Sequence, residues 1–195
     1  MKKRIFTAII VFLLLVIMFT LPAAADIGPK PSVVIKFKGL EGESYFVTLL
    51  SERDHYGPWS SNKEYSPIYG SEEVWEKFSS YSDPDGYRFI GYFSDCSGGD
   101  TFSWTYYPPE RFKILIYFPE YDRFVLSPGS YERYAFDSYY TVDARNIDLK
   151  SASLSGRELV VKRTYDYKWE ALSLLCRIAA TVCVELLVAL PFGFK

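Results

Sequence analysis

The segment Arg111–Phe118, with the sequence RFKILIYF, decides the fold that the sequence predicts. Its side chains alternate with the two-residue period of a β-strand. One face carries Phe112, Ile114, Ile116 and Phe118, and the other carries Lys113, Leu115 and Tyr117. A proline-initiated turn at residues 119–122 leads into a second β-rich run, Arg123–Leu126. The pattern predicts a β-hairpin.

A second alternating run, Ser32–Lys38, places Val33, Ile35 and Phe37 on one face. Two glycines in residues 39–43 separate it from another β-rich run, residues 45–50. We predict that these two runs also form a hairpin.

The remaining elements expected in this domain are short. Residues 54–70 are expected to form a loop, and Ser71 is expected to cap a short helix over residues 71–78. Further strands are predicted at residues 87–93, 101–106, 134–142 and 159–164. The sequence therefore predicts a mainly β domain, an antiparallel β-sandwich of seven or eight strands with one short helix. Its expected core contains Val33, Ile35, Phe37, Val47, Leu49, Phe112, Ile114, Ile116 and Phe118.

Residues 1–25 have the order of a secretory signal peptide. A basic start, Lys2-Lys3-Arg4, precedes an apolar run, and three alanines at residues 23–25 offer a cleavage site. The alternative is that this segment stays attached as a signal anchor. Either interpretation places the domain of residues 26–168 outside the cytoplasm.

Residues 169–195 are expected to form a transmembrane helix with a short cytoplasmic end. Ile178 to Phe194 is apolar apart from Thr181 and Glu185, and Lys195 follows as the positive-inside rule expects. Arg177 and Glu185 interrupt the expected helix, and ionisable residues inside a membrane usually face a partner helix or a wet cavity. We expect a helix contact there, either with another membrane protein or by self-association. The alternative is that Arg177 snorkels and Glu185 is protonated in lipid.

Composition argues against several classes of function. Lys and Arg number 22 against 24 Asp and Glu, whereas nucleic-acid binding needs clustered positive charge. His55 is the single histidine, and no Cys/His spacing typical of a zinc site occurs. A proline turn explains DPDG at residues 83–86 without calcium. We expect no metal, no cofactor and no catalysis.

Aromatic residues are abundant, with 17 Tyr, 15 Phe and 4 Trp. Exposed rings on a β surface can stack on sugars or anchor a partner. The candidate ligand-binding residues are Trp59, Trp104, Tyr106 and Tyr139. The alternative is that most of these rings pack in the core and across strands.

Several stretches resemble a family of Gram-positive bacterial membrane proteins with no known activity. They are IGPKPSV at residues 27–33, FSWTYYPPE at 102–110, YERYAFDSY at 131–139, and residues 169–193. The resemblance implies an exported β-rich domain followed by several transmembrane helices. Here one such helix is expected, as in a short or truncated member.

The sequence thus favours a non-catalytic interaction or sensory domain, tethered to the cell membrane by a single span. One alternative is a module that binds cell-surface glycans through exposed aromatic rings. Another is an accessory subunit of a multi-helix membrane complex, to which Glu185 points.

Overall fold

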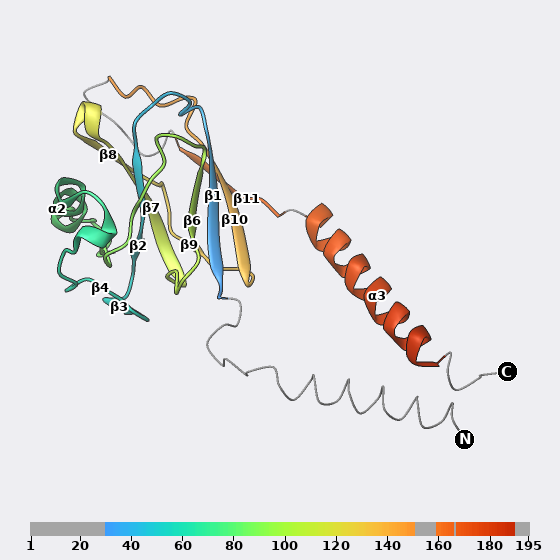
Figure 1. Ribbon diagram of the computed structural model, residues 1–195. Helices are drawn as coiled ribbons and strands as arrows, with labels where there is room; N and C mark the ends of the chain where they lie inside the picture. The colour runs from blue at the N-terminus through green and yellow to red at the C-terminus, as the bar shows by residue number, and fades with distance from the viewer. Residues whose placement is uncertain (1–29, 151–158, 166, 190–195) are drawn as a thin grey trace. The chain divides into compact units, whose positions relative to one another are not determined.

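The computed structural model describes residues 30–150, 159–165 and 167–189. Lys30–Tyr165 forms one compact unit, which we call the β unit, and helix α3 (Tyr167–Ala189) belongs to a second unit (Figure 1). The signal segment predicted for residues 1–25 lies outside the described residues, as does the chain after Ala189.

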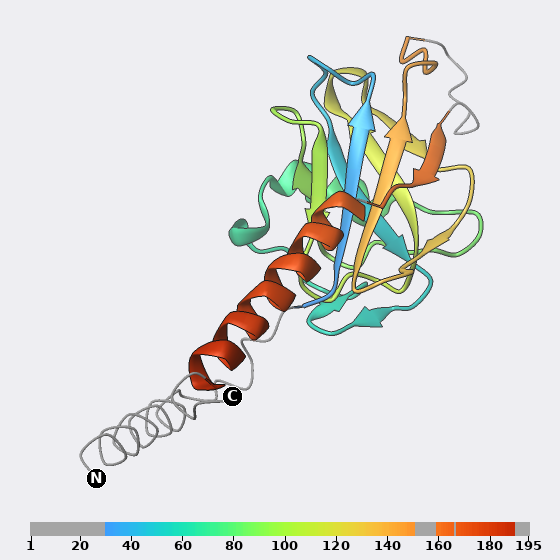
Figure 2. The same ribbon diagram turned by 90° about the vertical axis from the view of Figure 1, so that its right-hand side faces the viewer.

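The first sheet, sheet A, has the strand order β11-β10-β1-β6, which Figure 2 shows from its outer side. The strands are β1 (Ser32–Lys38), β6 (Thr101–Trp104), β10 (Asp137–Asp143) and β11 (Val160–Arg163). β1 and β10 run parallel, with Ser32 opposite Asp137, whereas the other two pairs are antiparallel. The sheet is therefore mixed, which corrects the prediction of a purely antiparallel fold.

The second sheet, sheet B, is antiparallel and has the order β5-β2-β7-β8. Its strands are β2 (Phe46–Ser51), β5 (Ser94–Asp95), β7 (Arg111–Phe118) and β8 (Arg123–Leu126), with β9 (Tyr131–Glu132) paired to the start of β7. The predicted hairpin of β7 and β8 is confirmed. Its turn contains the 3-10 helix η2 (Pro119–Tyr121) and ends on Asp122 in a left-handed conformation.

Sheets A and B enclose a common core, consistent with the predicted β-sandwich. All nine predicted core residues belong to this first core, and none is more than 2% exposed. Alternation along β1 and β7 therefore predicted burial correctly, because each strand turns one row of apolar side chains toward the opposite sheet.

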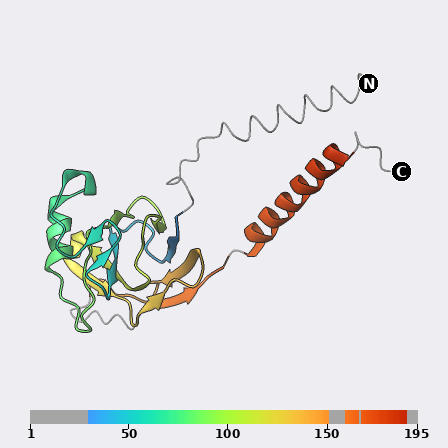
Figure 3. The same cartoon turned by 90° about the horizontal axis from the view of Figure 1, so that it is seen from below.

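Helix α2 (Glu72–Ser80) covers the other face of sheet B, so β7 is buried on both sides (Figure 3). The predicted cap is confirmed, because Ser71 Oγ accepts a hydrogen bond from Val74 N at 3.5 Å. A second core lies between the helix and the sheet. Its buried residues are Leu50, Val74, Trp75, Phe78, Phe89, Phe93, Leu115 and Tyr117.

The predicted hairpin of β1 and β2 is wrong. β1 pairs with β10 and β6 in sheet A, whereas β2 pairs with β5 and β7 in sheet B. Gly39 and Gly42 both have positive φ, 83° and 88°, and the connection that contains them carries the chain from one sheet to the other. The two apolar rows consequently face each other across the core instead of lying side by side.

The strand predicted at residues 87–93 is also wrong, because only an isolated bridge joins Arg88 to Ser51. Phe89 packs in the second core and Ile90 in the first. Gly91 follows with a φ of 88°. A segment that places consecutive side chains in two different cores, at the edge of a sheet, forms few of the backbone hydrogen bonds that pair strands.

The loop predicted at residues 54–70 contains a small hairpin of β3 (His55–Tyr56) and β4 (Trp59–Ser60), and the 3-10 helix η1 (Pro67–Tyr69).

Helix α3 occupies most of the segment predicted to be a transmembrane helix. Its described side chains are largely exposed, including Arg177 and Glu185. In the part of the chain that the structure describes, no helix combines the length and the apolar character needed to cross a membrane.

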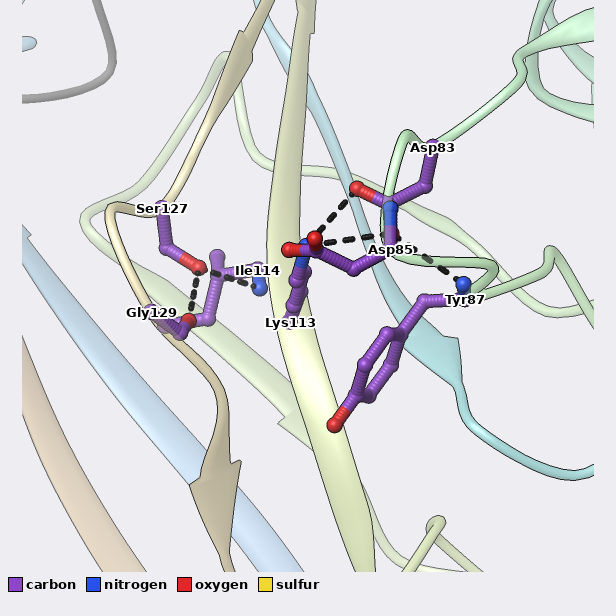
Figure 4. A network of polar contacts seen from close by, with 7 residues as sticks. All are labelled: Asp83, Asp85, Tyr87, Lys113, Ile114, Ser127 and Gly129. Carbon is purple, nitrogen blue, oxygen red and sulfur yellow. Dashed lines mark hydrogen bonds and ion pairs between the residues drawn. The ribbon is translucent and has the colours of Figure 1, made fainter.

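Ser127 closes a gap beside β7, between its pairing with β9 at Arg111–Phe112 and with β8 from Leu115 onward. Its backbone N donates to Ile114 O at 2.9 Å, and its Oγ accepts from Ile114 N at 3.0 Å (Figure 4). The same hydroxyl donates to Gly129 O at 3.0 Å. The side chain thus satisfies a buried backbone N–H that no strand reaches.

We predict that Ser127→Ala lowers the free energy of unfolding by about 1–3 kcal/mol, because it leaves the buried Ile114 N–H without an acceptor. Urea denaturation of this variant and of Ser130→Ala, which removes an exposed hydroxyl three residues away, measures the difference. Equal stability of the two variants would contradict this role for Ser127.

Candidate functional site

A cleft of about 600 Å³ lies beside the end of α2. One wall comes from the β3–β4 hairpin, and the other comes from the end of α2 and the loop that follows it. The lining residues are Asp54, Ser61, Asn62, Ser79, Ser80, Tyr81, Ser82, Asp83, Gly86, Tyr87, Arg88 and Phe89. The cleft falls within the size range of small-molecule sites.

The hairpin wall is held by Asp54. Its carboxylate accepts a hydrogen bond from Ser61 Oγ at 3.1 Å and forms an ion pair with Arg88. The backbone of Arg88 is itself fixed, because it exchanges two hydrogen bonds of 2.8 Å with Ser51. The hydrogen bond from Arg88 holds the pKa of the Asp54 carboxyl below its usual range, so the pair is ionised at neutral pH.

The second wall of the cleft is held by a buried ion pair. Lys113, 4% exposed on the outer face of β7, places its Nζ at 2.9 and 3.0 Å from the two carboxylate oxygens of Asp83 (Figure 4). It also contacts Asp85 at 2.5 Å and lies 5.0 Å from the ring centroid of Tyr87. Burial lowers the pKa of Lys113, but the hydrogen bonds to the two carboxylates outweigh it and raise the pKa overall. The lysine therefore stays charged.

The loop of residues 83–87 folds around the same carboxylate. Asp83 Oδ2 accepts from the backbone N of Asp85 and of Tyr87, each at 3.1 Å, and Gly86 N donates to Asp83 O at 3.1 Å. This is the turn that the sequence predicted, with Gly86 at a φ of 79°. The described residues hold no group of three His, Cys, Asp or Glu side chains suited to a metal ion.

The predicted residues Trp59, Trp104 and Tyr106 do come together. Both indole N–H groups donate to Tyr106 O, at 2.7 Å from Trp59 and 2.9 Å from Trp104. The two indole rings are 5.7 Å apart and edge to face. However, Trp104 is only 1% exposed, so its ring cannot stack on a ligand. Tyr106 is 43% exposed.

Trp59 serves instead to position the cleft wall. Lys63 Nζ lies 4.2 Å from the ring centroid of Trp59 and 4.5 Å from the ring centroid of Tyr69. The same ammonium donates a hydrogen bond to Pro58 O at 3.1 Å. These contacts fix the hairpin, and the next residues along the chain, Ser61 and Asn62, line the cleft.

Tyr139 does not join this cluster. It lies on β10 with its ring on the outer side of sheet A, whereas the adjacent Tyr140 is buried in the first core. The two neighbouring tyrosines therefore point to opposite faces of the sheet, as the two-residue period of a β-strand requires. Arg177 and Glu185 lie on α3, in the other unit.

Sequence reasoning missed the cleft. Its residues come from polar stretches that read as ordinary surface loops and a helix end. The one available signal was Lys113, a charged residue on a strand face that it shares with Leu115 and Tyr117.

Comparison with known proteins found no protein family, no curated protein and no solved structure that matches this chain. The resemblance to Gram-positive membrane proteins therefore stays a prediction.

We predict that Asp83→Ala lowers the free energy of unfolding by about 3 kcal/mol or more, because breaking a buried ion pair leaves an uncompensated charge. The matched control is Asp85→Ala, which removes the other carboxylate on the same lysine. The Asp85 side chain is 71% exposed, and exposed ion pairs contribute about 0.2–1 kcal/mol. Urea denaturation of both variants measures the two losses. A loss for Asp85→Ala as large as that for Asp83→Ala would contradict the assignment.

Proposed function

We propose that this chain is a membrane-tethered, extracytoplasmic recognition domain that binds its ligand without catalysis. The observation that carries the proposal is the cleft, in which each ionisable carboxylate already has a cationic partner. Arg88 neutralises Asp54, and Lys113 neutralises Asp83. Groups arranged in this way can hold a ligand but are poorly suited to accept a proton from it.

The nucleophilic groups of the β unit also favour binding over catalysis. The cleft is lined by serine hydroxyls, but none of its lining residues is a His or Lys that could act as their base, or a Cys. Cys96 is buried in the first core, and burial raises the pKa of its thiol to about 12. A thiol of that pKa is almost entirely protonated at neutral pH and therefore a weak nucleophile.

The apolar side chains exposed on α3 support the tether, although the described part of the helix does not by itself have the length and apolar character of a membrane span. Among its described side chains, seven large aliphatic ones are exposed in addition to Tyr167: Leu172, Leu174, Leu175, Ile178, Val182, Val184 and Leu186. At 100° per residue they cover most of the helix circumference, and a helix that is apolar on most sides is normally buried in lipid or in other protein. Thr181 Oγ1 donates to Arg177 O at 3.0 Å, so this hydroxyl does not need water.

Arg177 and Glu185 support a contact between α3 and another helix. Both are costly in lipid unless they are sheltered by a partner. We propose that α3 contacts a second membrane helix, supplied either by another protein or by a second copy of this chain. This contact is compatible with an accessory role in a larger membrane complex.

The tether is tested by membrane fractionation of the full chain expressed in bacteria. We expect the full chain to stay in the membrane pellet after an alkaline carbonate wash, and a variant lacking residues 167–195 to leave it. Protease added to intact protoplasts should digest the β unit and spare a tag placed after Lys195. Release of the full chain by carbonate, or cleavage of the tag with survival of the β unit, would overturn the proposal.

A further inference from the structure

The charged groups that line the cleft are already paired with opposite charges, which disfavours a strongly ionic ligand. The charged lining residues are Asp54, Asp83 and Arg88. Asp54 is paired with Arg88, and Asp83 with Lys113 beneath it. An anionic ligand would have to compete with Asp54 for Arg88, and a cationic ligand cannot reach the Asp83 carboxylate, because that side chain is 0% exposed. A neutral ligand needs neither of these charges.

The polar groups that remain are suited to hydroxyl groups. Ser61, Ser79, Ser80 and Ser82 contribute hydroxyls to the lining, and Asn62 contributes an exposed amide. Ser79 Oγ and Ser80 Oγ donate to carbonyls of their own helix, which leaves their lone pairs as acceptors. The Asn62 amide supplies both a donor and an acceptor. A ligand hydroxyl, which also donates and accepts, matches this set.

Two tyrosines supply apolar surface beside these groups. Tyr81 and Tyr87 both line the cleft and are half-buried. Tyr81 packs on Phe124 with ring centroids 4.9 Å apart, and Tyr87 lies against Lys113. Burial raises the pKa of Tyr81, so its hydroxyl stays protonated and can donate. Rings held in this way offer rigid, amphipathic surface for the C–H face of a sugar.

We propose that this cleft is a binding site for a neutral glycan, of a size up to a short oligosaccharide. The proposal deepens the recognition role proposed above and rests on it. It places the sugar at the cleft rather than at the aromatic cluster of Trp59, Trp104 and Tyr106. The cleft of about 600 Å³ has room for more than one sugar ring.

The full chain, purified in lipid nanodiscs, is applied to a glycan array that carries neutral and anionic oligosaccharides. We expect binding to neutral glycans that changes little between low and high salt, because no charge pair with the ligand is involved. The affinity for the strongest ligand is then measured by titration calorimetry for each variant.

Asn62→Ala should weaken binding about tenfold, because it removes a donor and an acceptor together. The matched control is Asn146→Ala, an exposed asparagine in a loop outside the cleft, which should bind like the wild type. Tyr81→Ala should also weaken binding, whereas Tyr106→Ala should not. Because Tyr81 packs on Phe124, the thermal stability of each variant is measured beside its affinity.

Three outcomes would overturn the ligand assignment. They are the absence of binding to any glycan, salt-sensitive binding to anionic glycans alone, and loss of binding in Tyr106→Ala with Asn62→Ala unaffected. Each can occur while the carbonate wash still retains the chain in the membrane. Failure of the ligand assignment is therefore distinguishable from failure of the tether.

Discussion

The burial of β7 on both faces is the constraint on which the rest of the β unit depends. Its inward row, from Phe112 to Phe118, packs against sheet A, and its outward row packs against α2. A strand buried in this way has no face left for an unpaired charge. Lys113 nevertheless lies on the outward row, so the fold must supply a counter-charge. The loop of residues 83–87 does so, and it also lines one wall of the cleft.

Sequence alternation predicted which side chains are buried, and together with the turn it predicted the β7–β8 hairpin, but it did not predict how β1 and β2 pair. β1 and β2 each carry an apolar row, and such rows fit equally well in one sheet or in two sheets that face each other. The structure adopts the second arrangement. Alternation also says nothing about strand direction, and the parallel partner of β1 begins 105 residues later, at Asp137. Pairing over that separation is set by the whole core, not by local pattern.

The candidate site was also harder to predict, because its residue types are compatible with more than one role. Tryptophan is large and amphipathic, so Trp104 could equally be an exposed platform or a core residue with one satisfied N–H. Trp104 is a core residue, and its indole N–H donates a hydrogen bond to Tyr106 O. The residues that line the cleft did not indicate a binding site, because serine, asparagine and aspartate are common in any solvated loop. Lys113 was the exception, because Leu115 and Tyr117 beside it indicated that its face is covered.

Because β7 is buried on both faces, we infer that it joins the sandwich and the α2 layer into one cooperative unit. Native-state hydrogen exchange of the β7 amides measures whether the two layers open together. We expect the Leu115 and Tyr117 amides to exchange only through global unfolding, with a free energy equal to that from urea denaturation. Exchange of these amides through a smaller opening, at a distinctly lower free energy, would show that the α2 layer detaches without unfolding the strand, so the two layers would not form one cooperative unit.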